Sequence, residues 1–274
     1  LNESGGWALD IEALQKSIDD ARANKILVRA LVFINPGNPT GQCLSKENLK
    51  DLIKFCHENR LILCADEVYQ ENIYQSNKSF ESARKVLGEM PEPFKSSVEL
   101  VSFHSTSKGF IGECGLRGGY MELHNFLPKV VEELYKISSV NLCPNLPGQF
   151  ATALMVDPPK QGDPSYELYE SEKRERLDSL TRRARMLSEA FNRLEGVSCQ
   201  VTEGAMYAFP QIAIPARAVK EAERLNKQPD VLYCLELLNE TGLCCVPGSG
   251  FQQAPGTYHF RTTILPAEEK FPEI

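Results

Sequence analysis

The sequence predicts an α/β protein, with a large domain built on a mostly parallel sheet and a smaller α+β domain after it. Apolar runs rich in β-branched residues alternate with segments whose apolar residues recur at helical spacing. Strands and helices that alternate in this way form parallel sheets. Polar turns follow three of the runs, and parallel sheets bind ligands at the carboxyl ends of their strands. We therefore expect the chemistry of this protein at one edge of the sheet.

The first predicted strand follows an amphipathic helix. Asp10 is a suitable N-cap for that helix, which extends to Ala23. Residues 26–34 are an almost continuous apolar run, which is typical of a strand buried on both faces. The run ends in residues 35–41, where two prolines and two glycines favour a rigid turn that carries Asn38.

A second helix and strand follow that turn. Ser45 is the expected N-cap of the helix. Residues 61–68 form the next predicted buried strand, which carries Asp66 into its end and is followed by Tyr69. Both polar side chains therefore belong to the same sheet edge as Asn38.

The third predicted strand, residues 98–103, leads into a polar segment that contains Lys108. Three hydroxyl residues precede this lysine, and Arg117 follows nine residues later with a cationic fork suited to a phosphate. A lysine amine beside phosphate-binding groups indicates a Schiff base to pyridoxal 5′-phosphate (PLP). The alternative is an ordinary surface turn. A helix over residues 128–138 is predicted next.

A change of pattern marks the second predicted domain. A long helix is predicted from an N-cap at Asp163 to Leu194, with Gly196 as its stop. We place the large domain at residues 1–164 and the small domain at 165–274, with a helix over 165–195 bridging the two. Further elements of the small domain are expected as strands at 197–201, 206–209 and 258–264, with Arg261 in the last, and helices over 229–240 and from 267.

Composition excludes several classes of function. The net charge of -7 and the lack of a basic stripe argue against a nucleic-acid partner. No apolar run has membrane-spanning length, and no signal peptide is visible, so we expect no membrane association. Nine scattered cysteines without zinc-site spacing indicate reduced thiols, a reducing intracellular compartment and no metal site. The cytoplasm, mitochondrion and peroxisome all remain open.

Four motifs together resemble one family. They are Asn-Pro-Gly-Asn-Pro-Thr-Gly at 35–41, Ala-Asp-Glu-Val-Tyr at 65–69, Ser-Thr-Ser-Lys-Gly at 105–109 and His-Phe-Arg at 259–261. In order and spacing they resemble the fold type I, PLP-dependent class I/II aminotransferases along almost the whole chain. The stretches at 112–120, 203–210 and 246–251 resemble the alanine aminotransferase branch, which includes the glutamate–glyoxylate aminotransferases.

The resemblance implies a role for each catalytic candidate. Lys108 would bond covalently to PLP and carry the proton between the substrate Cα and the cofactor. Asp66 would keep the pyridine nitrogen protonated, and Tyr69 and Asn38 would hydrogen-bond the phenolic oxygen. Each residue also has a structural alternative, since Asp66 could be a solvated acid, Tyr69 a core aromatic and Asn38 only a turn residue.

The remaining candidates would bind anionic groups. Ser105, Ser107 and Arg117 would hold the cofactor phosphate. Arg261 would bind the substrate α-carboxylate through two parallel hydrogen bonds, with Asn38 beside it. For Arg261 the alternative is a structural arginine between apolar neighbours.

The function implied by the resemblance is transamination between L-alanine and 2-oxoglutarate, which gives pyruvate and L-glutamate. Glutamate:glyoxylate transamination is the nearest alternative. A non-catalytic interaction module that retains the fold is a further alternative, and a lyase of the same fold, such as an aminocyclopropane-carboxylate synthase, is a weaker one. A homodimer is implied. We expect the chain to be a fragment that lacks the family's N-terminal phosphate loop, its ring-stacking aromatic residue and its C-terminal helix. Residues 252–253 are Gln-Gln where the family leads us to expect Gly-Gln, a change that would alter the reach of the loop.

Overall fold

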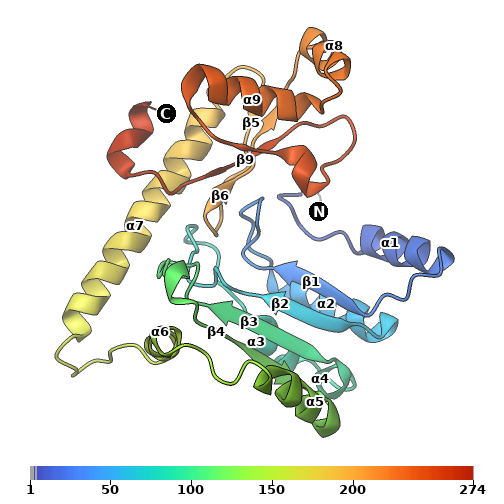
Figure 1. The fold of residues 1–274 in the computed structure, drawn as a ribbon, viewed down its shortest axis with the longest axis vertical. Helices are drawn as coiled ribbons and strands as arrows, with labels where there is room; N and C mark the ends of the chain where they lie inside the picture. Colours follow the sequence, from blue (N-terminus) through green and yellow to red (C-terminus); the bar gives the residue numbers. More distant parts are fainter. Residues whose placement is uncertain (1–2, 4, 274) are drawn as a thin grey trace.

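A four-stranded, mostly parallel sheet forms the centre of the N-terminal part of the chain. The structure is a computed structural model that describes residues 3 and 5–273 (Figure 1). Strands β1 (Ala30–Ile34), β2 (Ile62–Asp66) and β3 (Leu100–Ser105) are parallel, and β4 (Gly119–His124) is antiparallel to β3. The strand order is β1-β2-β3-β4. The predicted α/β class with a mostly parallel sheet is therefore confirmed.

Four helices pack into one core with this sheet. They are α1 (Ile11–Ala23), α2 (Lys46–Asn59), α3 (Ala83–Glu89) and α4 (Phe94–Ser97). The predicted N-caps are confirmed, because the side chain of Asp10 accepts from the Ala13 amide at 2.9 Å and Ser45 accepts from the Asn48 amide at 3.1 Å. Fully buried Leu side chains of α2 meet those of β2 and β3 in this core.

The first strand differs from the prediction. Only Ala30–Ile34 forms β1, and the strand is an edge strand of the sheet. Its burial alternates, with Phe33 in the core and Val32 69% exposed. Leu27, in the same predicted run, is 71% exposed. The expectation of a strand buried on both faces was wrong because the helical layer covers one face, so alternate side chains of β1 face away from it.

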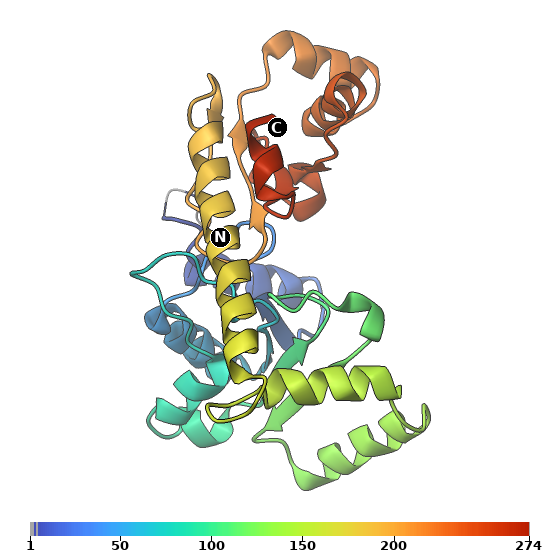
Figure 2. The same ribbon diagram turned by 90° about the vertical axis from the view of Figure 1, so that its left-hand side faces the viewer.

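Three helices connect the sheet to the C-terminal part. They are α5 (Pro128–Ser139), α6 (Leu146–Val156) and α7 (Tyr166–Phe191), and α7 runs along one side of the molecule (Figure 2). The predicted N-cap of α7 was wrong. Asp163 instead closes a turn by accepting from the Lys160 amide at 2.7 Å, and the helix begins at Tyr166. It also ends earlier than predicted, at Phe191.

Small antiparallel sheets and two helices form the C-terminal part. One sheet pairs β5 (Val197–Ser198) with β7 (Gln211–Ile212), and the other has the order β6-β9-β8, formed by Tyr207–Ala208, Phe260–Thr263 and Val246–Pro247. The helices are α8 (Ala216–Arg224) and α9 (Pro229–Thr241). Short 3₁₀ helices cover Cys114–Leu116 (η1), Gly248–Phe251 (η2) and Glu268–Glu273 (η3), so the helix expected from residue 267 is a 3₁₀ helix over its described part. The division at residue 164 stays a prediction.

The N-terminal segment packs against the C-terminal sheets. Trp7 meets Phe209 and His259 edge to face, with ring centroids 5.8 Å apart in both pairs. Glu3 contacts the Nε2 atom of buried His259 at 3.1 Å. Residues more than 200 positions apart in sequence are therefore neighbours.

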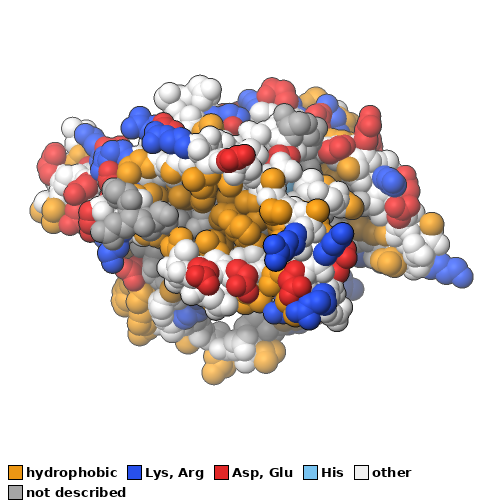
Figure 3. Space-filling view, turned by 90° about the horizontal axis from the view of Figure 1, so that it is seen from above, with side chains coloured by type: hydrophobic (Ala, Val, Ile, Leu, Met, Phe, Trp, Pro, Cys, Tyr) orange, Lys and Arg blue, Asp and Glu red, His pale blue; other side chains and the backbone are white. Residues whose placement is uncertain are grey.

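The surface combines charged and apolar regions. Seen from above, hydrophobic side chains gather in the hollowed centre of this face, and acidic and basic side chains surround them (Figure 3). Within the described part of the chain, no helix combines the length and the apolar character needed to cross a membrane.

Candidate active site

Strands β1 and β2 end level with one another, and the parallel strand β3 continues past them to Ser105, so the predicted site residues meet at one edge. Ile34 of β1 is in register with Asp66 of β2, which is in register with Phe103 of β3. The turns that follow these strands carry Asn38, Tyr69 and Lys108. Convergence at the carboxyl edge of the sheet, as predicted from the sequence, is what the parallel register produces.

The turn at 35–41 is held rigidly behind Asn38. Asn35 is fully buried, and its Oδ1 atom accepts from the Leu44 amide at 2.9 Å. Both Asn–Pro peptide bonds of the turn are cis. Gly41 has a positive φ of 71° and lies against the C-terminal part, since a Cβ atom there would be 2.9 Å from the carbonyl oxygen of Tyr207. The turn therefore fixes Asn38 between the two parts of the chain.

The segment that contains Lys108 is anchored by the buried side chain of Thr106. Thr106 binds the carbonyl oxygen of Gly118 through its amide, at 3.1 Å, and through its hydroxyl, at 3.2 Å. Lys108, two residues later, is exposed. Gly109 has a φ of 67°, and a Cβ atom there would lie 3.3 Å from the carbonyl oxygen of Val68. The loop that presents Lys108 thus touches the turn that follows β2.

The three predicted phosphate-binding residues lie around the end of β3. Ser105 and Ser107 are half-buried, and the hydroxyl of Ser105 accepts from the Ser107 amide at 3.3 Å. Arg117 is exposed, and its guanidinium donates to the carbonyl oxygen of Cys114 at 3.0 Å. Gly119 pairs with Ser105 across the strands, and a Cβ atom at Gly119 would be 2.8 Å from the carbonyl oxygen of His104. Two hydroxyls and a guanidinium suit an anion such as phosphate.

Two neighbouring carboxylates at the end of β2 have different surroundings. Asp66 is half-buried and accepts from the Val68 amide at 3.3 Å. Burial raises the pKa of Asp66, while the Val68 amide and the nearby His104 act in the opposite direction. Glu67 is buried and accepts from the Ala83 amide at 2.7 Å, and burial raises the pKa of this carboxyl to about 7. Asp66 is therefore the carboxylate available to a ligand, and Glu67 holds the start of α3.

A chain of four side chains connects the sheet edge with the C-terminal part. The hydroxyls of Tyr69 and Tyr207 are 2.9 Å apart. The guanidinium carbon of Arg261 lies 4.7 Å from the ring centroid of Tyr207, and its Nη1 donates to Oδ1 of Asn38 at 3.1 Å. Asn38, Tyr69 and Arg261 are thus brought together as predicted, and Tyr207 joins them.

Arg261 has an unused hydrogen-bond donor. Its Nε atom is buried and has no hydrogen-bond partner among the described residues. A buried guanidinium N–H without an acceptor costs free energy, and a carboxylate is the acceptor that matches the planar fork. Burial also raises the pKa of Tyr69, with the Tyr207 hydroxyl as the second cause, so Tyr69 keeps its proton in the neutral pH range.

Sequence reasoning missed two members of this cluster. They are Tyr207 and Phe251, whose rings both contact the guanidinium of Arg261. The ring centroid of Phe251, in η2, lies 5.2 Å from the guanidinium carbon. Both residues belong to stretches that carried the family resemblance, 203–210 and 246–251. The sequence therefore drew attention to both stretches, but no motif in it indicated that these two aromatic residues contact Arg261.

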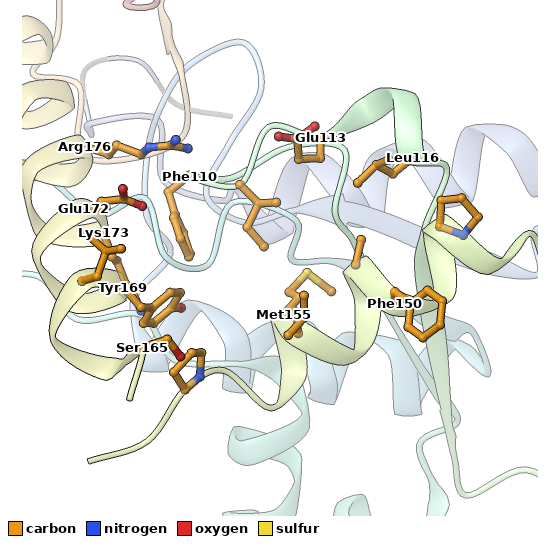
Figure 4. Close-up of a pocket in the computed structure, with 16 residues that line it drawn as sticks. Phe110, Glu113, Leu116, Phe150, Met155, Ser165, Tyr169, Glu172, Lys173 and Arg176 are labelled. Atoms are coloured by element: carbon orange, nitrogen blue, oxygen red, sulfur yellow. The ribbon is translucent and has the colours of Figure 1, made fainter. Parts of the chain in front are cut away.

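A separate cavity of about 660 Å³ lies between the loop after Lys108, α6 and α7 (Figure 4). Its lining includes Phe110, Phe150 and Met155, with Arg176 and Lys173 on the α7 side. Lys173 is paired with Glu71 at 3.0 Å. None of the predicted site residues lines this cavity, so it is distinct from the candidate active site.

The donor set at the sheet edge fits PLP. An amine, a carboxylate, a phenol, an amide and a set of phosphate-binding groups correspond to the aldehyde, ring nitrogen, phenolic oxygen and phosphate of that cofactor. The orphaned guanidinium N–H of Arg261 adds a place for a substrate carboxylate. No cluster of three or more metal-ligating side chains occurs within the part of the chain that the structure describes.

Comparisons with known proteins cover almost the whole chain. The family model described as "Aminotransferase class I and II" matches residues 1–270. The chain is 54% identical over its whole length to "Glutamate--glyoxylate aminotransferase 1" of Arabidopsis thaliana and 54% identical to "Alanine aminotransferase 1, mitochondrial" of the same plant. It covers 57% and 50% of these two proteins, so it spans about half the length of the curated relatives that it matches.

Solved structures show the same architecture. The chain aligns with an alanine aminotransferase from Pyrococcus furiosus at a TM-score of 0.76 and 25% identity, covering 100% of this chain and 63% of that one. An aminotransferase from Escherichia coli aligns at a TM-score of 0.72 and 28% identity, with 99% and 60% of the two chains covered.

Proposed function

Because the chain belongs to the class I and II aminotransferases, we propose that it binds PLP and takes part in the transfer of amino groups between small amino acids and 2-oxo acids. Family membership rests on a match over residues 1–270, and the family uses PLP. The observation that carries the proposal for this chain is the buried, unpartnered Nε of Arg261, which is linked through Asn38 and Tyr207 to the edge that presents Lys108.

The proposed cofactor site uses the residues at the ends of β2 and β3. PLP, when bound, supplies an aldehyde for an amine and a ring that accepts electrons. Lys108 provides the amine, which is a nucleophile and a proton carrier at its Nζ atom. Asp66 holds a proton on the ring nitrogen, and the hydroxyl of Tyr69 and the amide of Asn38 donate to the phenolic oxygen.

Anionic groups bind at two ends of the proposed site. Ser105, Ser107 and Arg117 bind the phosphate, because they combine hydroxyl and guanidinium donors at the end of β3. Arg261 binds the substrate α-carboxylate. The bond from Arg261 to Oδ1 of Asn38 fixes the amide so that its Nδ2 donor points away from the guanidinium.

We propose L-alanine and 2-oxoglutarate as the substrates, with glutamate and glyoxylate as the second candidate pair. Equal identity to proteins of both names supports keeping both reactions. The homodimer and the division at residue 164 are proposals too. Large exposed apolar side chains, such as Val32 and Phe150, support association with further protein surface.

The first experiment adds PLP to the purified chain and records the absorption spectrum before and after borohydride reduction. A visible band that reduction fixes covalently to the protein is expected in the wild type and absent in Lys108→Ala. Lys129→Ala, which removes an exposed lysine of α5, is the control and should retain the band. No band in folded wild-type protein would contradict the proposed cofactor site.

The second experiment separates the two substrate pairs. The loaded protein is offered L-alanine with 2-oxoglutarate, or L-glutamate with glyoxylate, and pyruvate and glycine are quantified. Faster pyruvate formation supports the alanine reaction, and faster glycine formation favours the alternative. A Lys108-dependent band without either product would support cofactor binding but contradict transamination by this chain.

A further inference from the structure

We propose that Tyr207 is a positioning residue that serves both ends of the site, orienting Arg261 with its ring and Tyr69 with its hydroxyl. The inference rests on the proposed function, because it concerns the carboxylate-binding and cofactor-facing residues of that site. Tyr207 lies on β6, which pairs with β9, the strand that carries Arg261. It is buried, with 7% of its surface exposed.

The ring of Tyr207 restricts the guanidinium of Arg261. Two rings flank that group, Tyr207 at 4.7 Å and Phe251 at 5.2 Å from the guanidinium carbon to the ring centroid. A guanidinium is attracted to the face of an aromatic ring, and the attraction is larger away from water. Asn38 occupies Nη1, so the rings and one hydrogen bond fix the plane of the fork while Nε stays unpartnered. A carboxylate then meets an oriented donor instead of a mobile side chain.

The hydroxyl of Tyr207 acts on Tyr69, at the cofactor-facing end of the proposed site. It lies 2.9 Å from the hydroxyl of Tyr69, and the two rings meet edge to face with an interplanar angle of 89°. Each hydroxyl has one proton, so only one of them donates within the pair. When an anionic oxygen accepts a hydrogen bond from the hydroxyl of Tyr69, the hydroxyl of Tyr207 can rotate and donate to the oxygen of Tyr69. A hydrogen-bonded chain of this kind strengthens its members cooperatively.

The two contacts can be separated by substitution. Tyr207→Phe keeps the ring on Arg261 and removes the hydroxyl that contacts Tyr69. Tyr207→Leu removes both. Tyr74→Phe is the matched control, because Tyr74 is also buried and its hydroxyl bonds the carbonyl oxygen of Ala205, not Tyr69.

The test uses the 274-residue chain labelled with ¹⁵N in arginine and ¹³Cζ in tyrosine, with propionate as the carboxylate probe. The Arg261 Nε signal is assigned by its absence from Arg261→Lys, and the Tyr69 signal by its absence from Tyr69→Phe. We expect propionate to shift the Arg261 signal of the wild type. Its dissociation constant should rise about threefold to thirtyfold in Tyr207→Leu and stay within about twofold in Tyr207→Phe.

The hydroxyl contact has its own readout. The ¹³Cζ signal of Tyr69 should move in Tyr207→Phe and in Tyr207→Leu, and it should stay in place in Tyr74→Phe. A merely structural role of Tyr207 would not divide the two readouts between the ring and the hydroxyl. If Tyr207→Leu does not fold, pentafluorophenylalanine at 207 keeps the ring's size and reverses its electrostatics, and the same loss of propionate affinity is expected.

The results distinguish the inference from the proposed function. Wild-type affinity for propionate in Tyr207→Leu and in the fluorinated variant, or an unmoved Tyr69 signal in Tyr207→Phe, would overturn the role of Tyr207 alone. A wild-type Arg261 signal that propionate does not move would overturn the carboxylate site, and the positioning role with it.

Discussion

Gln252 occupies a backbone conformation that suits glycine. It has a φ of 56° and ends η2, directly after Phe251. Its neighbour Gln253 connects the loop to its surroundings, donating to Asp230 at 3.0 Å and contacting Nδ1 of His259 at 3.0 Å. The family resemblance led us to expect glycine at 252, and the left-handed conformation is the physical reason for that preference.

Gln252→Gly should therefore stabilise the chain by up to about 1 kcal/mol, because it relieves the left-handed conformation at a small cost in unfolded-state entropy. Urea denaturation measures the change. Gln253→Gly serves as the comparison and should destabilise the protein, since it removes both contacts of that side chain. Equal effects of the two substitutions would contradict this explanation.

Most of the site residues that the sequence predicted end or follow strands in recognisable motifs. Asn38, Asp66, Tyr69 and Lys108 lie at the expected edge because parallel register alone brings strand ends together. Tyr207 could not be assigned in this way. Its hydroxyl contacts Tyr69, which is 138 residues away in sequence, and no local pattern specifies which aromatic side chain meets an arginine.

At the scale of elements, the buried carboxyl of Glu67, which accepts from the first residue of α3, makes the stability of the fold depend on pH. The ordinary pKa of this carboxyl is 4.5, and burial raises it to about 7 in the folded protein. The folded state therefore binds more protons than the unfolded state between these pH values. Stability contributed by the protonated carboxyl is lost as the pH rises from 4.5 through 7.

Glu67→Gln cannot ionise and keeps an oxygen that accepts from the Ala83 amide. We expect it to be more stable than the wild type above pH 7, by up to about 3 kcal/mol, and close to it near pH 4.5. Urea denaturation across this range measures the difference. Glu58→Gln, at an exposed position of α2, should keep the wild-type pH dependence. Parallel pH curves for wild type and Glu67→Gln would show that Glu67 is not the titrating group.

Helix α6 was not predicted, and its packing explains why. Residues 146–156 are apolar around most of the helix and have Pro147 and Gly148 in the first turn, so they show no amphipathic period. Helix α6 contacts the backbone before β4 at Gly148, because a Cβ atom there would lie 2.7 Å from the carbonyl oxygen of Arg117. Asn145 adds a hydrogen bond from Nδ2 to the same oxygen at 3.3 Å.

Gly148→Ala should push α6 away from the backbone at Leu116 and Arg117 and destabilise the protein by about 1–3 kcal/mol. If Arg117 holds the PLP phosphate as proposed, weaker retention of PLP should accompany the loss, since Arg117 belongs to the displaced backbone. Gly115→Ala is the control, because nothing lies within 4 Å of the Cβ atom that it would add. Thermal unfolding and equilibrium dialysis of PLP measure the two effects, and wild-type values for Gly148→Ala would refute the close contact.

At the scale of the whole molecule, the apolar surface is large for a protein that acts alone. Val32 on the edge strand β1 and Phe150 on α6 are 69% and 68% exposed. An exposed edge strand with apolar side chains is a template for association. The relatives are about twice as long as this chain, and the sequence alone could not show which of its apolar residues the sheet would leave uncovered.

We expect the chain to associate in a concentration-dependent way, and Val32→Lys to reduce that association, because the charge opposes burial of the strand edge. Light scattering after size-exclusion chromatography measures the mass at several concentrations. Ser76→Lys adds the same charge at an exposed polar position and should leave the association unchanged. A monomeric wild type at all concentrations would contradict the prediction.

The packing of Trp7 against Phe209 and His259 has a consequence for synthesis on the ribosome. The segment around Trp7 is translated long before the residues that it packs against. At about 5–20 residues per second, Trp7 waits roughly 10–50 s for His259 to be translated. The sheet of β1–β4 can assemble during this interval. The segment around Trp7 therefore docks after this sheet can form, and the tryptophan side chain lacks these two partners until then.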